Sequence, residues 1–202
     1  MDSDLADSIS ALREAFDLRH LRVKFGKADS PAVERLRQRL KIPRRFREFL
    51  LNADPLDLET RTPAERVRLI PATRIEEEQA GFAMLETGTL RTGASETGWR
   101  PSWVIIGHSA VLGDPYFLDV SQPDAEGDCP VYTAMSGTDV WKPRLCASSF
   151  ATFLRILAVA MTVAKNFPDT AADIDDEDVF REALGPKIRE YDPAALKAGH
   201  WT

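Results

Sequence analysis

The segment from residue 103 to residue 157 constrains the fold more than any other part of the chain. It predicts short apolar strands separated by turn residues, at residues 103–106, 116–120 and 131–135. A very apolar helix then begins at Ser148 or Ser149. Its core face is predicted to carry Phe150, Phe153, Leu154, Leu157 and Met161. Neighbouring short strands, followed by a helix that must be buried, favour an α+β domain with a mostly antiparallel sheet.

The chain before this segment is predicted to be mainly helical. Apolar residues at helical spacing predict a first helix over residues 4–18. Ser30 is expected to cap a second helix with Pro31 at its first position, and Pro43 is expected to open a third. Further predictions are a loop at residues 53–63, a strand at 66–70 and an exposed loop or loose hairpin at 87–100.

Three consecutive glutamates follow the strand at residues 66–70. Thr73 is expected to cap a helix that contains Glu76, Glu77 and Glu78, because carboxylates stabilise a helix N-terminus. At the other end of the chain, the sequence predicts an acidic connector at 169–178, a helix at 179–189 and a turn at 193–197. A chain of 202 residues fits one domain, here residues 1–202, with the sheet packed by N- and C-terminal helices.

The order of motifs between residues 41 and 157 resembles the SUKH superfamily (Smi/Knr-like). Its relatives include fungal cell-wall-synthesis regulators and bacterial toxin-immunity proteins. Ile42-Pro43, Phe46 and Phe49-Leu50 are similar to the family's entry helix, although Asn52-Ala53-Asp54 stands where a glycine commonly closes it. The most specific match is Gly113-Asp114-Pro115-Tyr116-Phe117-Leu118-Asp119, and Val131-Tyr132, Trp141 and Ser149-Phe150 complete the order. Residues 1–40 and 166–202 lie outside this match as helical extensions.

This resemblance implies a protein-binding module rather than an enzyme, similar to immunity proteins that cover the active site of a cognate toxin. The expected partner is a protein, for example a basic toxin domain such as a nuclease. The acidic matched region suggests the partner-binding residues: Glu76, Glu77, Glu78, Asp114, Tyr116 and Asp119. We expect them on the sheet face, or its rim, opposite the helix at 149–165, with Asp119 facing solvent.

Two other functions stay open from the sequence. One is a regulatory scaffold like the fungal members of the family. The other is a small hydrolase in which Asp114 or Asp119 orients His108, although no G-x-S-x-G motif surrounds the adjacent Ser109. The remaining histidines, His20 and His200, form no i, i+4 pair with His108 or with each other.

The sequence predicts no metal or cofactor site. The densest group of carboxylates could stabilise turns, contact a partner or bind a hard cation, but its spacing does not fit a calcium loop. Its members are Asp114, Asp119, Asp124, Glu126 and Asp128. A second acidic group suits a helix N-terminus better than an EF-hand, because it lacks the central glycine: Asp173, Asp175, Asp176, Glu177 and Asp178. Cys129 and Cys146 are expected to be reduced thiols, with a single disulfide as the alternative.

Charge is unevenly distributed over a chain whose formal net charge is −6. Residues 1–51 are net positive and the remainder is net negative, which disfavours nucleic acid as a partner and allows a basic protein. A basic run is expected to form a solvated helical face that pairs with the acidic body, with phosphate binding as the alternative: Arg35, Arg37, Arg39, Lys41, Arg44, Arg45 and Arg47. Trp99, Trp103 and Trp141 are expected to pack around the strands, with a ligand platform as the alternative.

The first ten residues, MDSDLADSIS, contain neither a basic nor an apolar stretch, so we expect no secretory signal. The longest apolar stretch, residues 156–164, is far shorter than the roughly 20 residues that span a bilayer. The sequence therefore predicts a cytoplasmic protein that does not enter a membrane.

Overall fold

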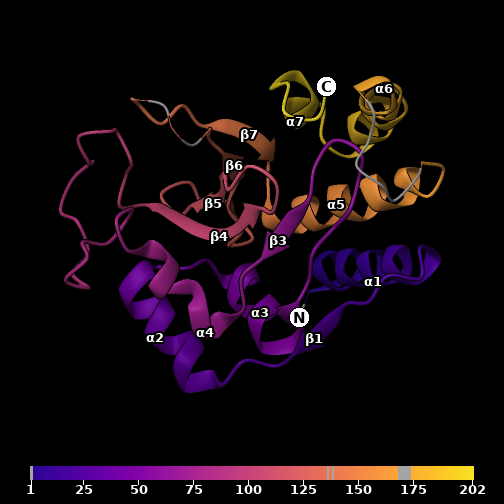
Figure 1. The fold of residues 1–202 in the computed structure, drawn as a ribbon. Helices are drawn as coiled ribbons and strands as arrows, with labels where there is room; N and C mark the ends of the chain where they lie inside the picture. The colour runs from indigo at the N-terminus through magenta and orange to yellow at the C-terminus, as the bar shows by residue number, and fades with distance from the viewer. Residues whose placement is uncertain (1, 136, 138, 168–173) are drawn as a thin grey trace.

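The computed structural model describes residues 2–135, 137, 139–167 and 174–202. In chain order the elements are α1 (Ser3–Leu18), β1 (Lys24–Gly26), α2 (Ser30–Leu40), α3 (Arg44–Ala53), β2 (Asp54–Asp57), β3 (Val67–Leu69), α4 (Ala72–Ile75), the 3-10 helix η1 (Glu77–Gln79), β4 (Trp103–Ser109), β5 (Pro115–Asp119), β6 (Val131–Thr133), β7 (Arg144–Ala147), α5 (Phe150–Ala164), α6 (Ile174–Tyr191) and α7 (Pro193–Lys197). The predicted α+β class and mostly antiparallel sheet are confirmed (Figure 1).

The main sheet has the order β3-β4-β5-β6-β7, with every neighbouring pair antiparallel, and β1 and β2 form a separate two-stranded sheet. The register of β4 against β5 shifts between Ile105 and Gly107, which marks a bulge. A Cβ atom at Gly107 would lie 2.7 Å from the backbone oxygen of Arg68 on β3. Only glycine therefore lets β3 approach β4 this closely at the bulge.

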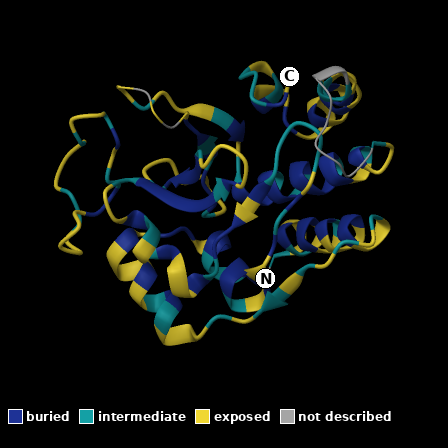
Figure 2. Ribbon diagram, viewed as in Figure 1, coloured by how far each residue is buried: buried dark blue, intermediate teal, exposed yellow. Residues whose placement is uncertain are grey.

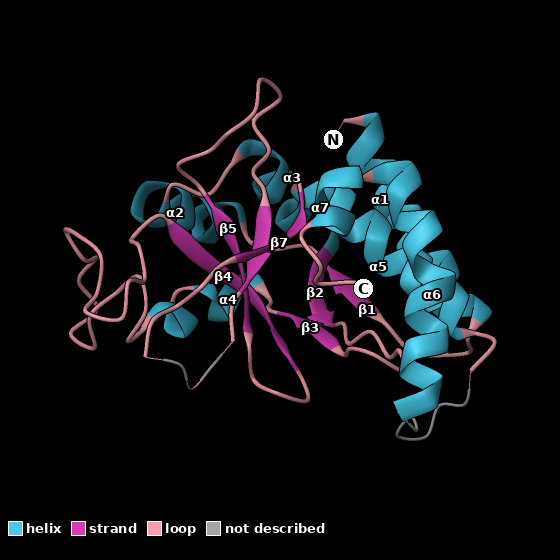
Figure 3. Ribbon diagram, turned by 90° about the horizontal axis from the view of Figure 1, so that it is seen from above, coloured by secondary structure: helices cyan, strands magenta, loops and turns pink. Residues whose placement is uncertain are grey.

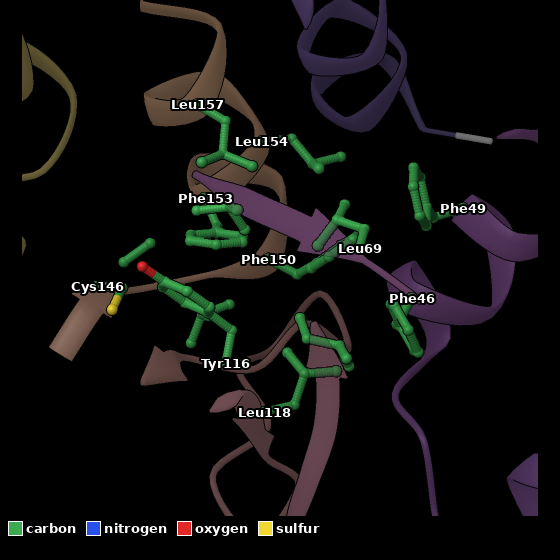
Figure 4. Packing of buried hydrophobic residues seen from close by; sticks show 14 of the residues in the cluster. Phe46, Phe49, Leu69, Tyr116, Leu118, Cys146, Phe150, Phe153, Leu154 and Leu157 are labelled. Atoms are coloured by element: carbon green, nitrogen blue, oxygen red, sulfur yellow. The ribbon is translucent and has the colours of Figure 1, made fainter. Parts of the chain in front are cut away.

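Helix α5 covers one face of the sheet, as its apolar sequence requires. The ring of Tyr116 on β5 lies 5.6 Å from that of Phe153, and Phe150 stands edge-on to Phe46 and Phe49 of α3 at 4.9 and 5.0 Å (Figure 4). Ser149 caps α5, because its hydroxyl accepts a hydrogen bond from the amide of Thr152. Helices α1 and α6 pack against α5 on the outside of this layer (Figures 1 and 3).

The opposite face of the sheet is also covered, by the segment between η1 and β4. Trp99 in that segment is only 1% exposed, and its ring lies 4.8 Å from Phe117 of β5 and 5.4 Å from Trp103. The expectation that the tryptophans pack around the strands is confirmed for these two, and Trp141, 5.3 Å from Trp99, joins them at the rim. Every residue of β5 is consequently buried, and β4 is dark blue in Figure 2 along nearly its whole length.

The helix expected from Thr73 across the glutamates is wrong. Helix α4 begins after Pro71 and ends at Ile75, and Glu77 opens a 3-10 turn instead. The reason is Gln79, which is fully buried: its amide donates to the backbone oxygens of Ile75 and Ile105 and accepts from the amide of Ile105. These bonds fasten the turn to β4 next to the bulge and prevent a longer helix.

Other differences are smaller. The loop expected at 53–63 contains β2, and strands β1 and β7 were not predicted. The cap of α2 is Asp29 rather than Ser30. The acidic connector expected at 169–178 is helical from Ile174, where α6 begins. Residues 169–173 of that prediction, Asp173 included, lie outside the described residues.

Candidate partner-binding cleft

A cleft of about 1190 Å³ opens on the described surface. Its walls come from five parts of the chain: Arg19 at the end of α1, residues 61–66 before β3, the β4–β5 turn, the β6–β7 connection, and α6 together with His200. Figure 1 shows the segment before β3 rising between β7 and α6. The cleft thus lies at one end of the sheet, where loops meet the C-terminal helices.

Exposed apolar side chains surround this cleft. Val111 and Leu112 in the β4–β5 turn are 65% and 67% exposed, and Met135 and Val140 after β6 are 63% and 49% exposed. Large apolar side chains gathered at a hollow, rather than scattered singly, mark interaction sites. The rim is therefore suited to contact another macromolecule.

The charged residues of the cleft lean positive, in contrast to the net charge of the chain. The cations are Arg19, Arg61, Arg66, Lys142, Arg144 and Arg181, and the carboxylates are Glu65, Asp114, Asp139 and Glu177. Arg181 and Glu177 neutralise each other across one turn of α6, with Nη2 and Oε1 2.8 Å apart. Arg66, Lys142 and Arg144 form no ion pair with any residue that the structure describes.

Polar groups form the floor of the cleft. The hydroxyl of Ser109 donates to Oε1 of Glu65 at 2.8 Å, and the hydroxyl of Tyr116 lies 3.1 Å from Nε2 of His200. Burial raises the pKa of Glu65, although the Ser109 hydrogen bond acts in the opposite direction. Burial, together with the charges of Arg181 and Arg144, lowers the pKa of His200 to about 3. The floor therefore holds a neutral imidazole and a carboxyl that resists ionisation.

The glutamates of the expected partner surface lie elsewhere, beside a shallow hollow of about 360 Å³. Glu76 pairs with Arg39 of α2, and Glu78 pairs with Arg74 and with His108. Glu77 is 76% exposed at its side chain and has only a long contact of 3.8 Å with Arg74. Glu77 is therefore the most available charge of the three.

The other three residues expected at that surface are separated from it. Asp114 lines the cleft and is half-buried. Tyr116 is fully buried and faces α5, so its expected position on the opposite face is wrong: the aromatic side chain packs on Phe153. The expectation that Asp119 faces solvent is also wrong, because it is 2% exposed.

Asp119 is buried because β5 is covered on both faces, and its carboxylate has a structural role. It accepts hydrogen bonds from Trp103 Nε1 at 3.3 Å, from the Ser121 hydroxyl at 2.6 Å and from the Gln122 amide at 2.7 Å. Burial alone would raise the pKa of Asp119, but the hydrogen bonds from Ser121 and Gln122 outweigh it, so the pKa lies below its usual value. Whether any of the six expected residues contacts a partner stays a prediction, and burial removes Tyr116 and Asp119 from the exposed set.

The hydrolase arrangement considered from the sequence is not assembled. His108 lies on β4, and its Nε2 is 3.1 Å from Oε2 of Glu78, rather than bonded to Asp114 or Asp119. The hydroxyl of Ser109, the next residue, donates to Glu65 and accepts from the amides of Val111 and Leu112. These bonds direct the hydroxyl toward Glu65, whereas a catalytic nucleophile would be hydrogen-bonded to its base.

The acidic loop before β6 has structural roles too. Asp124 accepts from the amides of Glu126 and Asp128 and so closes a turn. Asp128 is fully buried and accepts from the amides of Phe150 and Ala151 at 2.9 and 3.1 Å, so it stabilises the N-terminus of α5. In the described part of the chain, no group of three or more His, Cys, Asp or Glu side chains could hold a metal ion.

Asp128 also explains why one member of the basic run is buried. Arg45, whose side chain is 7% exposed, lies with Nη1 3.5 Å from Oδ2 of Asp128 and with Nε 2.6 Å from Oδ2 of Asp2. The expectation of a solvated face is therefore wrong for Arg45. It holds for exposed members such as Arg37, which pairs with Glu34 on the same helix, and Arg39, which reaches Glu76.

The sequence did not point to the cleft. Its walls come mainly from loops without periodic patterns. Two of its residues, Glu65 and His200, are 135 positions apart in the sequence. One signal was present: Val111-Leu112, two large apolar residues in a turn that a glycine closes, cannot both be buried in a short hairpin connection.

Comparison with known protein families places most of the chain in one family. The model of the SMI1 / KNR4 family (SUKH-1) matches residues 27–156, which include α2, the whole five-stranded sheet and the first half of α5. No curated protein matches the chain significantly. Helix α1, helix α6 and the C-terminal segment with His200 lie outside the match, although α6 and His200 form one wall of the cleft. None of the helices in the described ranges is both long enough and apolar enough to cross a membrane.

Proposed function

Because the chain belongs to the SMI1 / KNR4 family (SUKH-1), we propose that it is a non-enzymatic protein-binding module of the immunity type, which neutralises a cognate bacterial toxin by covering the toxin's active site. The observation that carries the proposal is the apolar rim of the cleft, formed by Val111, Leu112, Met135 and Val140. An inhibitor of this kind needs a shaped surface with a few desolvated anchors and needs no chemistry of its own.

The acidic residues are the second part of the proposal. Glu76, Glu77 and Glu78 would attract a basic toxin domain, such as a nuclease, whereas Asp114 lies apart from them among the cations of the cleft. Such charges mainly raise the association rate, whereas the buried apolar anchors set the dissociation rate. The partner would therefore be steered by one surface and held by another.

The proposal includes a cytoplasmic location, where a toxin that acts inside the cell must be met. Cys129 and Cys146 support it, because both are buried free thiols. Burial raises the pKa of Cys129 to about 12, with the charge of Asp128 acting in the same direction, so this thiol is not poised to react.

The direct test is coexpression with the candidate toxin encoded beside the gene. We expect the protein to restore growth of cells that express the toxin, and the purified pair to elute together as a stable complex. Absence of both rescue and complex for the toxins encoded in the neighbourhood would overturn the proposal.

An enzymatic role is tested separately with ester, phosphoester and peptide substrates. We expect no turnover by the purified protein. Turnover that disappears in His108→Ala and persists in His20→Asn would overturn the non-enzymatic part of the proposal, because only His108 lies on the sheet with a carboxylate partner.

A further inference from the structure

We infer that the cleft binds a segment of the partner in which carboxylate side chains flank one or two large apolar anchors. The inference rests on the proposed protein-binding function, but not on the identity of the partner or on its overall charge. It differs from the expectation of a basic partner surface, which concerns the glutamates at residues 76–78 on another part of the molecule.

The apolar part of this segment follows from the geometry of the rim. Leu112 comes from the β4–β5 turn and Met135 from the β6–β7 connection, and both are exposed by nearly two thirds at the same cleft. Methionine adapts its shape to irregular apolar surfaces, which suits a site that closes around an inserted side chain. One or two apolar anchors from a partner would remove these side chains from water.

The acidic part follows from the charges that remain unsatisfied. Lys142 and Arg144 are exposed and lie on the β7 side of the cleft, and Arg66 lies on the β3 side, with no ion pair to any described residue. Arg144 Nη1 donates a hydrogen bond to the backbone oxygen of Gly199, at 3.3 Å. Carboxylates between these two sides would meet cations on both, whereas lysines would be repelled.

The carboxylates of the cleft do not cancel this preference. Glu177 is paired with Arg181, and Glu65 is held by the Ser109 hydroxyl at the floor. The other two carboxylates of the lining, Asp114 and Asp139, are outnumbered by the three cations named above together with Arg61, whose Nε lies 3.9 Å from Oε1 of Glu59. A chain with a net charge of −6 therefore gathers an excess of cations at this cleft.

Nucleic acid would also be attracted by these cations, but it matches the rim poorly. Phosphates gain nothing from Leu112 or Met135, and the described lining of the cleft contains no exposed aromatic side chain on which a base could stack. A protein segment with both carboxylates and apolar side chains satisfies both features of the cleft.

The probe is a fluorescein-labelled ten-residue peptide in which Glu and Asp alternate with Leu and Phe. Two matched peptides replace either the acidic residues with Lys or the apolar residues with Ser, and a single-stranded DNA oligonucleotide is the fourth probe. Fluorescence anisotropy should show at least tenfold tighter binding of the acidic, apolar peptide than of the other three. Equal or tighter binding of the lysine peptide or of the DNA would overturn the inference.

Two double variants of the full chain locate the binding. Leu112→Ser with Met135→Ser, and separately Lys142→Glu with Arg144→Glu, should each weaken the peptide at least tenfold. The apolar control is Val179→Ser with Leu85→Ser, which removes exposed side chains outside the cleft. The charge control is Lys27→Glu with Arg35→Glu, which changes the net charge equally. Wild-type binding by both cleft variants would contradict the inference.

Thermal melting checks that each variant is folded. Should Arg144→Glu unfold the protein through its contact with the Gly199 carbonyl, Lys142→Glu with Arg66→Gln replaces it and carries the same expectation.

Failure of this inference is distinguishable from failure of the proposed function. If the wild type and both cleft variants neutralise the toxin equally, the cleft is not the anchor site and only the inference fails. If the wild type binds the acidic peptide but neutralises no neighbouring toxin, only the proposed function fails.

Discussion

The hydroxyl of Tyr116 lies 3.1 Å from Nε2 of His200, so the central strand of the sheet is bonded to the C-terminal segment. Next to it, the indole of Trp201 donates to the backbone oxygen of Cys146 on β7 at 2.8 Å. Asp192 accepts hydrogen bonds from the backbone and hydroxyl of Ser148, just before α5. Residues 174–202 are therefore part of the same packed unit as the family region, although the family model does not extend over them.

This contact predicts a loss of stability in acid. The pKa of His200 in the folded protein is about 3, below the ordinary value of 6.5, because of burial and the charges of Arg181 and Arg144. As the pH falls below about 6.5, His200 binds a proton in the unfolded chain but stays neutral in the folded chain. The free energy of unfolding therefore decreases as the pH falls from about 6.5 to about 3. Glu65 acts with the opposite sign: its raised pKa adds stability at low pH that is lost as the pH rises through its folded pKa.

We expect His200→Gln to make the melting temperature less sensitive to pH between 7 and 4.5. The difference from the wild type should be about 2–4 °C, the shift that about 1 kcal/mol produces in a chain of this size, after allowing for the solvent contact that His200 keeps. His20→Asn is the matched control, because His20 is exposed and Asn tolerates its positive φ. Parallel pH curves for His200→Gln and the wild type would contradict the prediction.

Phe153 is predicted to contribute strongly to stability. It is fully buried between α5 and Tyr116 of the sheet, so Phe153→Ala should lower the free energy of unfolding by about 3–5 kcal/mol. Val179→Ala on α6, where the side chain is 56% exposed, should change it by less than about 0.5 kcal/mol. Urea unfolding measures both, and a loss below about 1 kcal/mol for Phe153→Ala would show that this core contact is misplaced.

The buried pair of Arg45 and Asp128 gives a third prediction. Arg45→Met leaves the buried Asp128 without its cation and should cost about 3–5 kcal/mol, because an uncompensated charge remains in the interior. Arg37→Met breaks the exposed pair with Glu34 and should cost far less in urea unfolding, because solvent screens that pair.

A double variant separates charge from packing at this pair. Asp128→Asn removes the carboxylate charge but keeps one oxygen acceptor for the amides at the start of α5. Combined with Arg45→Met, it should recover part of the stability that Arg45→Met loses in urea unfolding. Additive losses in the double variant would mean that the two side chains do not interact.

The glutamates at residues 76–78 predict a salt-dependent association rate. Glu76→Lys with Glu77→Lys should slow association with a basic toxin and leave the melting temperature nearly unchanged, because exposed charges contribute little to stability. The attraction is screened over about 8 Å at physiological salt, so surface-binding kinetics should show the wild-type on-rate falling as salt rises. Asp7→Lys with Glu14→Lys on α1 changes the net charge equally and should have a smaller effect. An on-rate that neither salt nor the first double variant alters would place the contact elsewhere.

The last prediction concerns metals. No suitable ligand group occurs among the described residues, so dialysis against EDTA should leave the melting temperature unchanged, as should an excess of Ca²⁺ or Zn²⁺ afterwards. A fall of many degrees on chelation, reversed by one of the metals, would require a site that involves the remaining residues.

The sequence predicted the elements whose cause is local. The stripe through Phe153 and the cap at Ser149 place α5 within one residue, because helix periodicity and capping act over a few positions. Strand β7 was missed because its four residues, Arg144–Ala147, show no alternation, and their burial depends on Trp201 far along the chain. The burial of Asp119 could not be predicted either, because it depends on the segment around Trp99 covering the second sheet face.

The candidate site was predicted less well for the same reason. Charge in the sequence drew attention to Glu76, Glu77 and Glu78, but it cannot show that Arg39 and Arg74 already accompany two of them. The cleft depends on loops that converge only in the folded chain, and its positive character is opposite to the average of the sequence.

The covering of both sheet faces has a consequence for how such a protein can diversify. With α5 on one side and the Trp99 segment on the other, neither face of β5 is open to a partner, which can instead contact the loops at the ends of the sheet. Val111, Leu112, Met135 and Lys142 lie in such loops, where replacement costs little stability. New specificity can accumulate there while β4 and β5 stay unchanged, so two proteins with this fold can recognise unrelated partners and still share one interior.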